Sequence, residues 1–326
     1  MWKKVLALAV AACMLLSCCA AAMAESKVYH VGILQLVQHA ALDAATKGFQ
    51  DKLTELLGEG NVTFDYQNAQ GDSAQCSTIA LNFVNNAYDL IMANATPALQ
   101  ACVTASADSG IPVVGTSVTD YATALANPDM DAAVGTGINV TGVSDGVNPM
   151  LYAQMTMELV PEAKNVSILF CSAEPNSIVQ SDGFIAAMAE IAPDVTCSVF
   201  AFADSNDMQS VVVAAIENAD ALYIPTDNTA ASNMTIVANA CIPAAIPVIA
   251  GEENMMSAGG LATVSISYYD VGVLAAQQAY EVLVNGADIG AQPILYSENP
   301  VKEYNPDFAD AIGFSMPEGY TAFTAE

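Results

Sequence analysis

Two short apolar runs, Ala221–Ile224 and Pro247–Ala250, each end in polar side chains that could hold a small ligand. Asp227 and Asn228 follow the first run, and Glu252 follows the second. A carboxylate in a closed cleft makes a charge-assisted hydrogen bond to an ammonium group, and an amide can bind either polar end of a ligand. Asp227 could instead cap a following helix. The pattern predicts one wall of a small-molecule site.

These side chains need a sheet to position them. An apolar run of this length bounded by turn residues is typical of a buried strand in a parallel sheet. The segment between the two runs, Thr229–Cys241, has the length and composition of a crossover helix. Because ligands of such sheets bind beyond the carboxyl ends of the strands, the residues after each strand are the candidates.

In the first half of the chain, three hydroxyl side chains follow predicted strands. Thr96 precedes a helix that begins near Pro97, and Ser117 and Thr119 follow the next strand. Hydroxyls and backbone N–H groups at a helix N-terminus can hold a carboxylate. Thr96 could equally be a plain helix N-cap, and the two roles are compatible.

Four more candidates follow or lie in other strands. Asn176 and Ser177 come after a predicted strand at 166–171, where Ser177 could also cap its helix. Gln35 lies within the first strand, and His39 follows it. His39 could stack on or hydrogen-bond to an aromatic ligand side chain, or be an incidental loop residue. All four are predicted to bind ligand.

Enzyme signatures are lacking. The sequence has only His30 and His39, and it contains no H-E-x-x-H, no P-loop and no G-x-G-x-x-G after a strand. The composition and motifs therefore favour a binding protein without cofactor or metal over an enzyme.

The charge of the chain excludes two further classes of function. All seven basic residues are lysine, against 35 acidic residues, and the net charge is −28. Nucleic-acid binding needs clustered basic side chains, and an anionic membrane surface would repel this chain. Without arginine, a ligand carboxylate must be held by backbone N–H groups, hydroxyls or a helix N-terminus.

The first 24 residues predict export. Lys3 and Lys4 precede an apolar run, and small residues lead to an A-x-A site before Glu25, as in a secretory signal peptide. Alternatively, Cys18 or Cys19 becomes the lipidated first residue of a lipoprotein. Either leader places the protein outside the cell membrane, on the cell surface or in a periplasm.

Five cysteines remain after this leader, none with C-x-x-C spacing. Cys76 with Cys102, or Cys171 with Cys197, could form disulfides in an exported protein. Buried free thiols are the preferred interpretation.

Strand and helix patterns alternate along the mature chain and predict two α/β lobes with parallel sheets. The predicted strands are 28–37, 62–66, 89–94, 112–117, 166–171, 195–202, 221–224, 247–250 and 261–267. The predicted helices are 41–57, 73–86 (with Ser73 as N-cap), 97–109, 148–160, 177–191, 206–218, 229–241 and 269–285. Residues 121–147 are predicted to be a loop.

The interruption of the alternating strand and helix patterns at 121–147 suggests the lobe boundaries. We expect residues 25–142 with about 268–290 to form one lobe, and 143–267 with about 291–326 the other. The chain would then cross three times between the lobes, which makes a hinge that can close over a ligand.

Nine stretches, in order along the chain, resemble one family: the extracellular substrate-binding proteins of ABC transporters that take up tryptophan, tyrosine or phenylalanine. They are VGILQLVQHAALDAATKGF near the start, FDYQNAQGD at 64–72, DLIMANATPALQA at 89–101, GTSVTD at 115–120, VTGVSD at 140–145, PNSIVQ at 175–180, LYIPTDN at 222–228, IPVIAGEE at 246–253 and ATVSISYYDVG at 262–272. Ala40 departs from the family pattern, where a proline is expected, and so does the loss of nearly all basic residues.

The resemblance implies a type I periplasmic-binding fold: two doubly wound lobes joined by a three-strand hinge. It implies a monomer that binds a free aromatic amino acid and delivers it to an ABC permease and ATPase. A branched-chain amino acid or sugar as ligand, or a secreted adhesin or sensor module, remain the alternatives.

Overall fold

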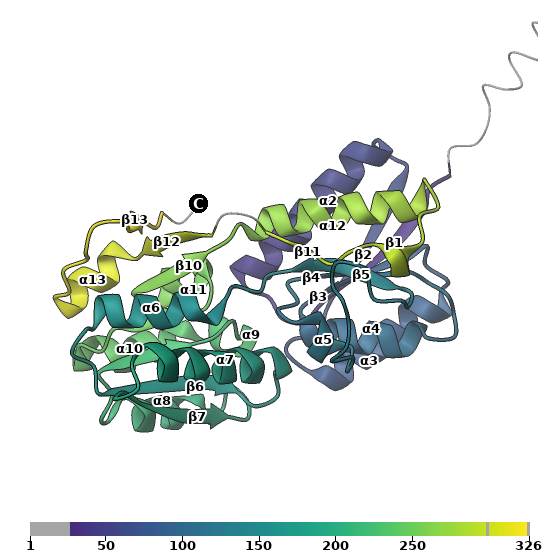
Figure 1. Ribbon diagram of the computed structural model, residues 1–326. Helices are drawn as coiled ribbons and strands as arrows, with labels where there is room; N and C mark the ends of the chain where they lie inside the picture. The colour runs from purple at the N-terminus through teal and green to yellow at the C-terminus, as the bar shows by residue number, and fades with distance from the viewer. Residues whose placement is uncertain (1–26, 298–299, 325–326) are drawn as a thin grey trace, which may run out of the picture.

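The computed structural model describes residues 27–297 and 300–324 (Figure 1). The predicted leader, with Cys18 and Cys19, lies outside the described residues. Within them, no helix is long and apolar enough to cross a membrane. The five cysteines of the described chain are free thiols, as preferred from the sequence.

Two mainly parallel sheets, each covered by helices, form two lobes (Figure 1). This confirms the predicted fold class. The first sheet has the order β11-β5-β4-β3-β1-β2 and consists of β1 (Tyr29–Gln35), β2 (Val62–Asn68), β3 (Leu90–Asn94), β4 (Val113–Thr116), β5 (Val140–Ser144) and β11 (Leu295–Tyr296). The second has the order β13-β12-β10-β9-β8-β6-β7 and consists of β6 (Asn165–Cys171), β7 (Thr196–Phe202), β8 (Ala221–Ile224), β9 (Val248–Ala250), β10 (Ala262–Ser265), β12 (Val301–Tyr304) and β13 (Thr321–Ala322).

Helices pack on both faces of each sheet. Those of the first lobe are α2 (Ala40–Leu57), α3 (Ser73–Asn85), α4 (Thr96–Ser106), α5 (Tyr121–Ala124) and α12 (Tyr268–Leu283), with the short 3-10 helix η1 (Ile289–Ala291). Those of the second lobe are α6 (Pro149–Leu159), α7 (Pro175–Ile191), α8 (Met208–Ile216), α9 (Asn228–Ala231), α10 (Met234–Ala244), α11 (Glu253–Ala258) and α13 (Pro306–Ile312). The fully apolar strands suit this arrangement, since every residue of β8 and β9 is buried between helices.

The strand register brings the candidate residues to one edge of each sheet. In the first sheet, Gln35 at the end of β1 lies opposite Asn94 at the end of β3, which in turn lies opposite Thr116 at the end of β4. In the second, Ile224 at the end of β8 lies opposite Ala250 at the end of β9. The polar residues that follow these strands are therefore neighbours in space although they are far apart in the sequence.

Three segments cross between the sheets, after β5, after β10 and after β11. Two of them are bonded to each other, because the Tyr268 hydroxyl donates to Asp145 Oδ2 at 2.8 Å. β11 pairs with β5 in the first sheet, whereas β12 pairs with β10 in the second. The exact lobe boundaries given above stay a prediction.

Three local predictions were wrong, and some elements were not predicted at all. The expected loop at 121–147 contains α5 and β5, the latter hidden by the loop-like composition of VTGVS. The N-cap of α3 is Asp72, not Ser73, because the Asp72 carboxylate accepts from two backbone N–H groups. The single helix expected after β8 is two, α9 and α10, and α11 was not predicted.

Two glycines let α2 and α12 pack closely (Figure 1). A Cβ added to Gly48 would lie 2.1 Å from the carbonyl oxygen of Tyr269, and one added to Gly272 would lie 2.0 Å from that of Ala45. The obstacle in both cases is backbone, which cannot turn away as a side chain can. α2 and α12 together cover one face of the first sheet. Their close packing keeps the start of α12 beside the crossing segments.

We expect Gly272→Ala to lower the free energy of unfolding by about 1–3 kcal/mol, because the added methyl group must push the helices apart. Denaturant unfolding followed by circular dichroism measures this. Gln277→Ala, on the exposed face of the same helix, is the control and should change stability by less than about 0.5 kcal/mol. Equal stability of the two variants would contradict the close-packing argument.

Candidate functional site

The predicted site residues lie at the carboxyl ends of strands in both lobes, and most are buried. His39 and Thr119 are partly exposed. The other eight are less than 9% exposed: Gln35, Thr96, Ser117, Asn176, Ser177, Asp227, Asn228 and Glu252. Buried polar groups need hydrogen-bond partners. These residues therefore fall into two sets: those whose side chains are hydrogen-bonded within the protein, and those that leave a buried polar atom unpaired.

A hydrogen bond joins the two lobes directly. His39, the residue before α2, places its Nε2 3.1 Å from Oδ1 of Asn228 at the start of α9. Burial lowers the pKa of the His39 imidazole, so the ring is neutral. This contact shows that the lobes are closed against each other in the structure.

Glu174 was missed by the sequence reasoning. Its carboxylate accepts four hydrogen bonds, from the backbone N–H groups and side chains of Asn228 and Thr229, at 2.6–3.0 Å. The residue precedes Pro175 in a turn, and no spacing in the sequence relates it to α9. Its role is to fix Asn228, the second-lobe partner of His39.

Asp227 caps α9. Its Oδ1 accepts from the N–H of Ala230 at 2.8 Å, and its Oδ2 accepts from the N–H of Cys171 at 2.7 Å. Burial and the charge of nearby Glu174 raise the pKa of Asp227 to about 8. The capping alternative is therefore what the structure shows, and a contact of Asp227 with ligand stays a prediction.

Glu252 and Asp145 differ from these two carboxylates because each has an oxygen without a partner. Glu252 Oε2 accepts from the N–H of Asn254 at 2.7 Å, while its Oε1 is buried and unpaired. Asp145, which the sequence reasoning did not single out, accepts from Tyr268 through one oxygen and leaves Oδ1 buried and unpaired. Burial raises the pKa of Asp145, and it raises the pKa of Glu252 to about 7.

No basic side chain neutralises either carboxylate. The ion pairs within 27–297 and 300–324 are Lys27–Asp89, Lys47–Asp51, Lys52–Glu55 and Lys302–Glu158. Lys164, the remaining lysine of that part of the chain, is exposed, and the sequence has no arginine. The arrangement suits a ligand that brings its own positive charge.

Three further candidates also carry unpaired buried atoms. They are the hydroxyls of Thr96 and Ser117 and the Oδ1 atom of Asn176. Thr96 is the first residue of α4, an 11-residue helix whose N-terminus favours negative charge. The first lobe therefore offers hydroxyl and helix-end donors opposite the carboxylates of the second.

The other candidates are engaged in structural bonds. Gln35 donates to Val37 and Asp43 and accepts from Thr46, which uses both ends of its amide. Ser177 is the third residue of α7 and donates through its hydroxyl to the carbonyl oxygen of Thr226 at 3.3 Å, so it does not cap that helix. The carbonyl oxygen of Thr119 accepts from Ser144.

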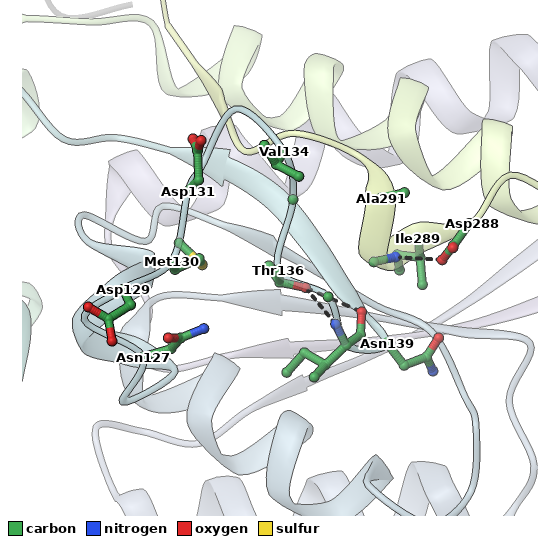
Figure 2. Close-up of a pocket in the computed structure, with 14 residues that line it drawn as sticks. Asn127, Asp129, Met130, Asp131, Val134, Thr136, Asn139, Asp288, Ile289 and Ala291 are labelled. Carbon is green, nitrogen blue, oxygen red and sulfur yellow. Dashed lines mark hydrogen bonds between the residues drawn. The ribbon is translucent and has the colours of Figure 1, made fainter.

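A cavity of about 170 Å³ lies between the lobes; Glu174 and Thr229 line it, but none of the ten predicted site residues does. Its walls include Leu36, Gly71 and Pro97 from the first lobe and Glu174, Thr229 and Asn233 from the second. A larger hollow of about 650 Å³ lies elsewhere, on the first lobe between residues 127–139 and 288–291, and includes none of the predicted site residues (Figure 2).

Comparison with known proteins shows the family of this chain. The model of the ABC transporter substrate binding protein family matches residues 30–321. A tyrosine-binding protein of Clostridioides difficile (strain R20291) is 33% identical over 292 residues, which cover 88% of this chain and 82% of that protein.

Two solved structures show which lobe arrangement this one resembles. The ABC domain from Streptococcus pneumonia in complex with L-Trp is 32% identical, with a TM-score of 0.82 over 90% of this chain and 99% of that one. A substrate-binding protein with adhesive properties from Clostridium difficile, in a ligand-free, open structure, is 31% identical, with a TM-score of only 0.67 over 92% of this chain and 100% of that one. Since the identities are nearly equal, the lower score indicates that the lobes are arranged differently from those of the open structure, in agreement with the bond between His39 and Asn228. The chain belongs to the substrate-binding proteins of ABC transporters.

Proposed function

We propose that this protein captures a free aromatic α-amino acid between its two lobes and presents it to an ABC permease driven by an ATPase. The observation that carries the proposal is the unpaired, buried Oε1 of Glu252, which has no basic partner in the described chain. An ammonium group would supply both the missing charge and the missing hydrogen-bond donor.

The two ends of such a ligand would be held differently. Glu252 and Asp145 take the ammonium group, while Thr96, Ser117 and the N-terminus of α4 take the carboxylate. Asn176, whose Oδ1 is unpaired, orients the ligand on the second lobe, and Asn228 contributes through its bond to His39. The aromatic character of the ligand is supported by the tyrosine-binding relative and by the relative solved with L-Trp.

Closure, not catalysis, is the proposed mechanism. Substrate-binding proteins of ABC transporters typically have no enzymatic activity, and they act outside the cytoplasm. A ligand that binds the closed form better than the open form shifts the population towards closure. We further propose that the protein is an exported monomer, either secreted after cleavage before Glu25 or anchored by lipid at Cys18 or Cys19.

Thermal-shift screening of the twenty amino acids tests the ligand class. A ligand at a hundred times its Kd should stabilise the protein by about 2.7 kcal/mol. We expect aromatic amino acids to raise Tm. Stabilisation by sugars or branched-chain amino acids alone would show that the ligand class is wrong.

Glu252→Gln tests the ammonium contact. The new amide oxygen can still accept from the N–H of Asn254, so the fold should survive, but the negative charge is lost. We expect binding to weaken roughly 10- to 150-fold, because a hydrogen bond to a charged group contributes about 1.5–3 kcal/mol. Glu59→Gln, at an exposed position, is the control for isothermal titration calorimetry. Equal affinity of both variants for the amino acid would remove Glu252 from the site.

Proton release tests the same contact independently. In the closed form without ligand, burial raises the pKa of Glu252 to about 7, so the carboxyl of that form is largely protonated at pH 6. An ammonium group favours the ionised form and lowers this pKa, so binding should release a proton at pH 6, and affinity should rise between about pH 5 and pH 8.

Calorimetric titration at pH 6 in buffers of different ionisation enthalpy measures the number of protons released on binding. The wild type should show a binding enthalpy that varies with the buffer, and Glu252→Gln should show less variation. Identical buffer dependence in both proteins would assign the proton to another group.

A further inference from the structure

The bond between the lobes determines the chemical state of His39. Glu174 accepts from four donors, and a carboxylate in that position is an acceptor only. One of these donors is Nδ2 of Asn228, at 2.6 Å from Glu174 Oε2. The Asn228 amide therefore has its NH₂ group towards Glu174 and its oxygen towards His39.

This orientation fixes the tautomer of His39. Since Asn228 Oδ1 can only accept, Nε2 of His39 must carry the proton and donate at 3.1 Å. A neutral imidazole carries one proton, so Nδ1 is a bare acceptor. The charges that face the ring come from Glu174 across the cleft and from Asp43 on α2, and neither is bonded to it.

That acceptor has no partner in the described part of the chain. Nδ1 of His39 is buried from solvent and has no hydrogen-bond donor among the described residues, although the opposite edge of the ring reaches the other lobe. A buried acceptor left unpaired is costly, whereas a ligand donor at the same place would satisfy it. The ring lies at the interface of the two lobes, since its Nε2 edge contacts Asn228 of the second lobe.

We propose that Nδ1 of His39 accepts a hydrogen bond from the ring of the bound amino acid, so that the site selects a phenol O–H or an indole N–H over an unsubstituted phenyl ring. This rests on the proposed function and adds the basis of its selectivity. Tyrosine and tryptophan carry such a donor, and phenylalanine does not. His39 is then a specificity-determining residue, and Asn228 and Glu174 are positioning residues that hold its tautomer.

Calorimetric titration with the three amino acids tests the selectivity. We expect the wild type to bind tyrosine or tryptophan about 10- to 100-fold more tightly than phenylalanine, because phenylalanine leaves Nδ1 unpaired. His39→Ala should weaken all three, since the bond to Asn228 is lost, but the preference over phenylalanine should fall to about one. A preference that survives in His39→Ala, or its absence in the wild type, would overturn the proposal.

The tautomer can be observed directly, because the sequence contains only two histidines. In ¹⁵N-histidine-labelled protein, the His30→Gln variant gives signals from His39 only. His30 is exposed, and its Nδ1 lies 2.8 Å from Oγ1 of Thr63. We expect Nε2 of His39 to be protonated and Nδ1 unprotonated in the closed protein, and the Nδ1 resonance to move on addition of tyrosine or tryptophan but not phenylalanine.

The other outcomes each count against the ring contact. A protonated Nδ1, or an equal movement with phenylalanine, would mean that no ring donor reaches it and would overturn the proposal. Binding of all three amino acids without preference would overturn the ring contact alone. Absence of binding by any amino acid would overturn the proposed function as well, and the two failures are thereby distinguished.

Discussion

Negative charge buried without a basic partner is the constraint on which this structure depends. Glu174, Asp227, Glu252 and Asp145 are each 3% exposed or less, and none is in an ion pair with a lysine of the described chain. Isolated buried charge is costly, so each carboxylate must be stabilised by neutral donors or become protonated. Glu174 accepts from four donors and Asp227 from two, whereas Glu252 and Asp145 each leave one oxygen bare. The bare oxygens mark where a ligand cation would complete the site.

The fold supplies this arrangement through the ends of its strands. Parallel register places the residues after β3 and β4 at one edge of the first sheet and those after β8 and β9 at one edge of the second. Closure brings the two edges together, and the His39–Asn228 bond crosses between them. The bond from Tyr268 to Asp145 holds two crossing segments together at the base of the same cleft. The proposed site would thus belong to neither lobe alone.

The sequence predicts the elements better than the contacts. Apolar runs bounded by turn residues located β8 and β9 to within one residue, because buried parallel strands leave little else for such runs to be. β5 was not predicted because Gly142 and its neighbours have a loop-like composition. The glycine is required by packing, since a Cβ at position 142 would lie 2.1 Å from the hydroxyl oxygen of Tyr121.

The candidate residues were predicted by position and not by partner. Placing them after strands is a local inference, but the number of donors at each carboxylate depends on residues distant in sequence. Asp227 receives an N–H from Cys171, and Glu174 binds a helix that begins more than fifty residues later. His39 and Asn228 are separated by 189 positions and meet only when the lobes close. No periodicity in a single sequence encodes such pairs, so Glu174 and Asp145 could be found only in the structure.

The same bare oxygens explain why closure should depend on ligand. In the structure, Glu252 and Asp145 are buried and each leaves one oxygen unpaired, so without a ligand they either carry unsolvated charge or take up protons. Closing an empty cleft therefore costs free energy, through desolvation or through uptake of protons. In the proposed function a zwitterion would remove that cost, because its ammonium group would pair with these carboxylates and its carboxylate with the donors of the first lobe. The similar protein from Clostridium difficile is open when ligand-free, whereas this closed arrangement superposes better on the relative with bound L-Trp. Selective binding of ligand and selective closure are thus one event, enforced by charge that the protein does not neutralise itself.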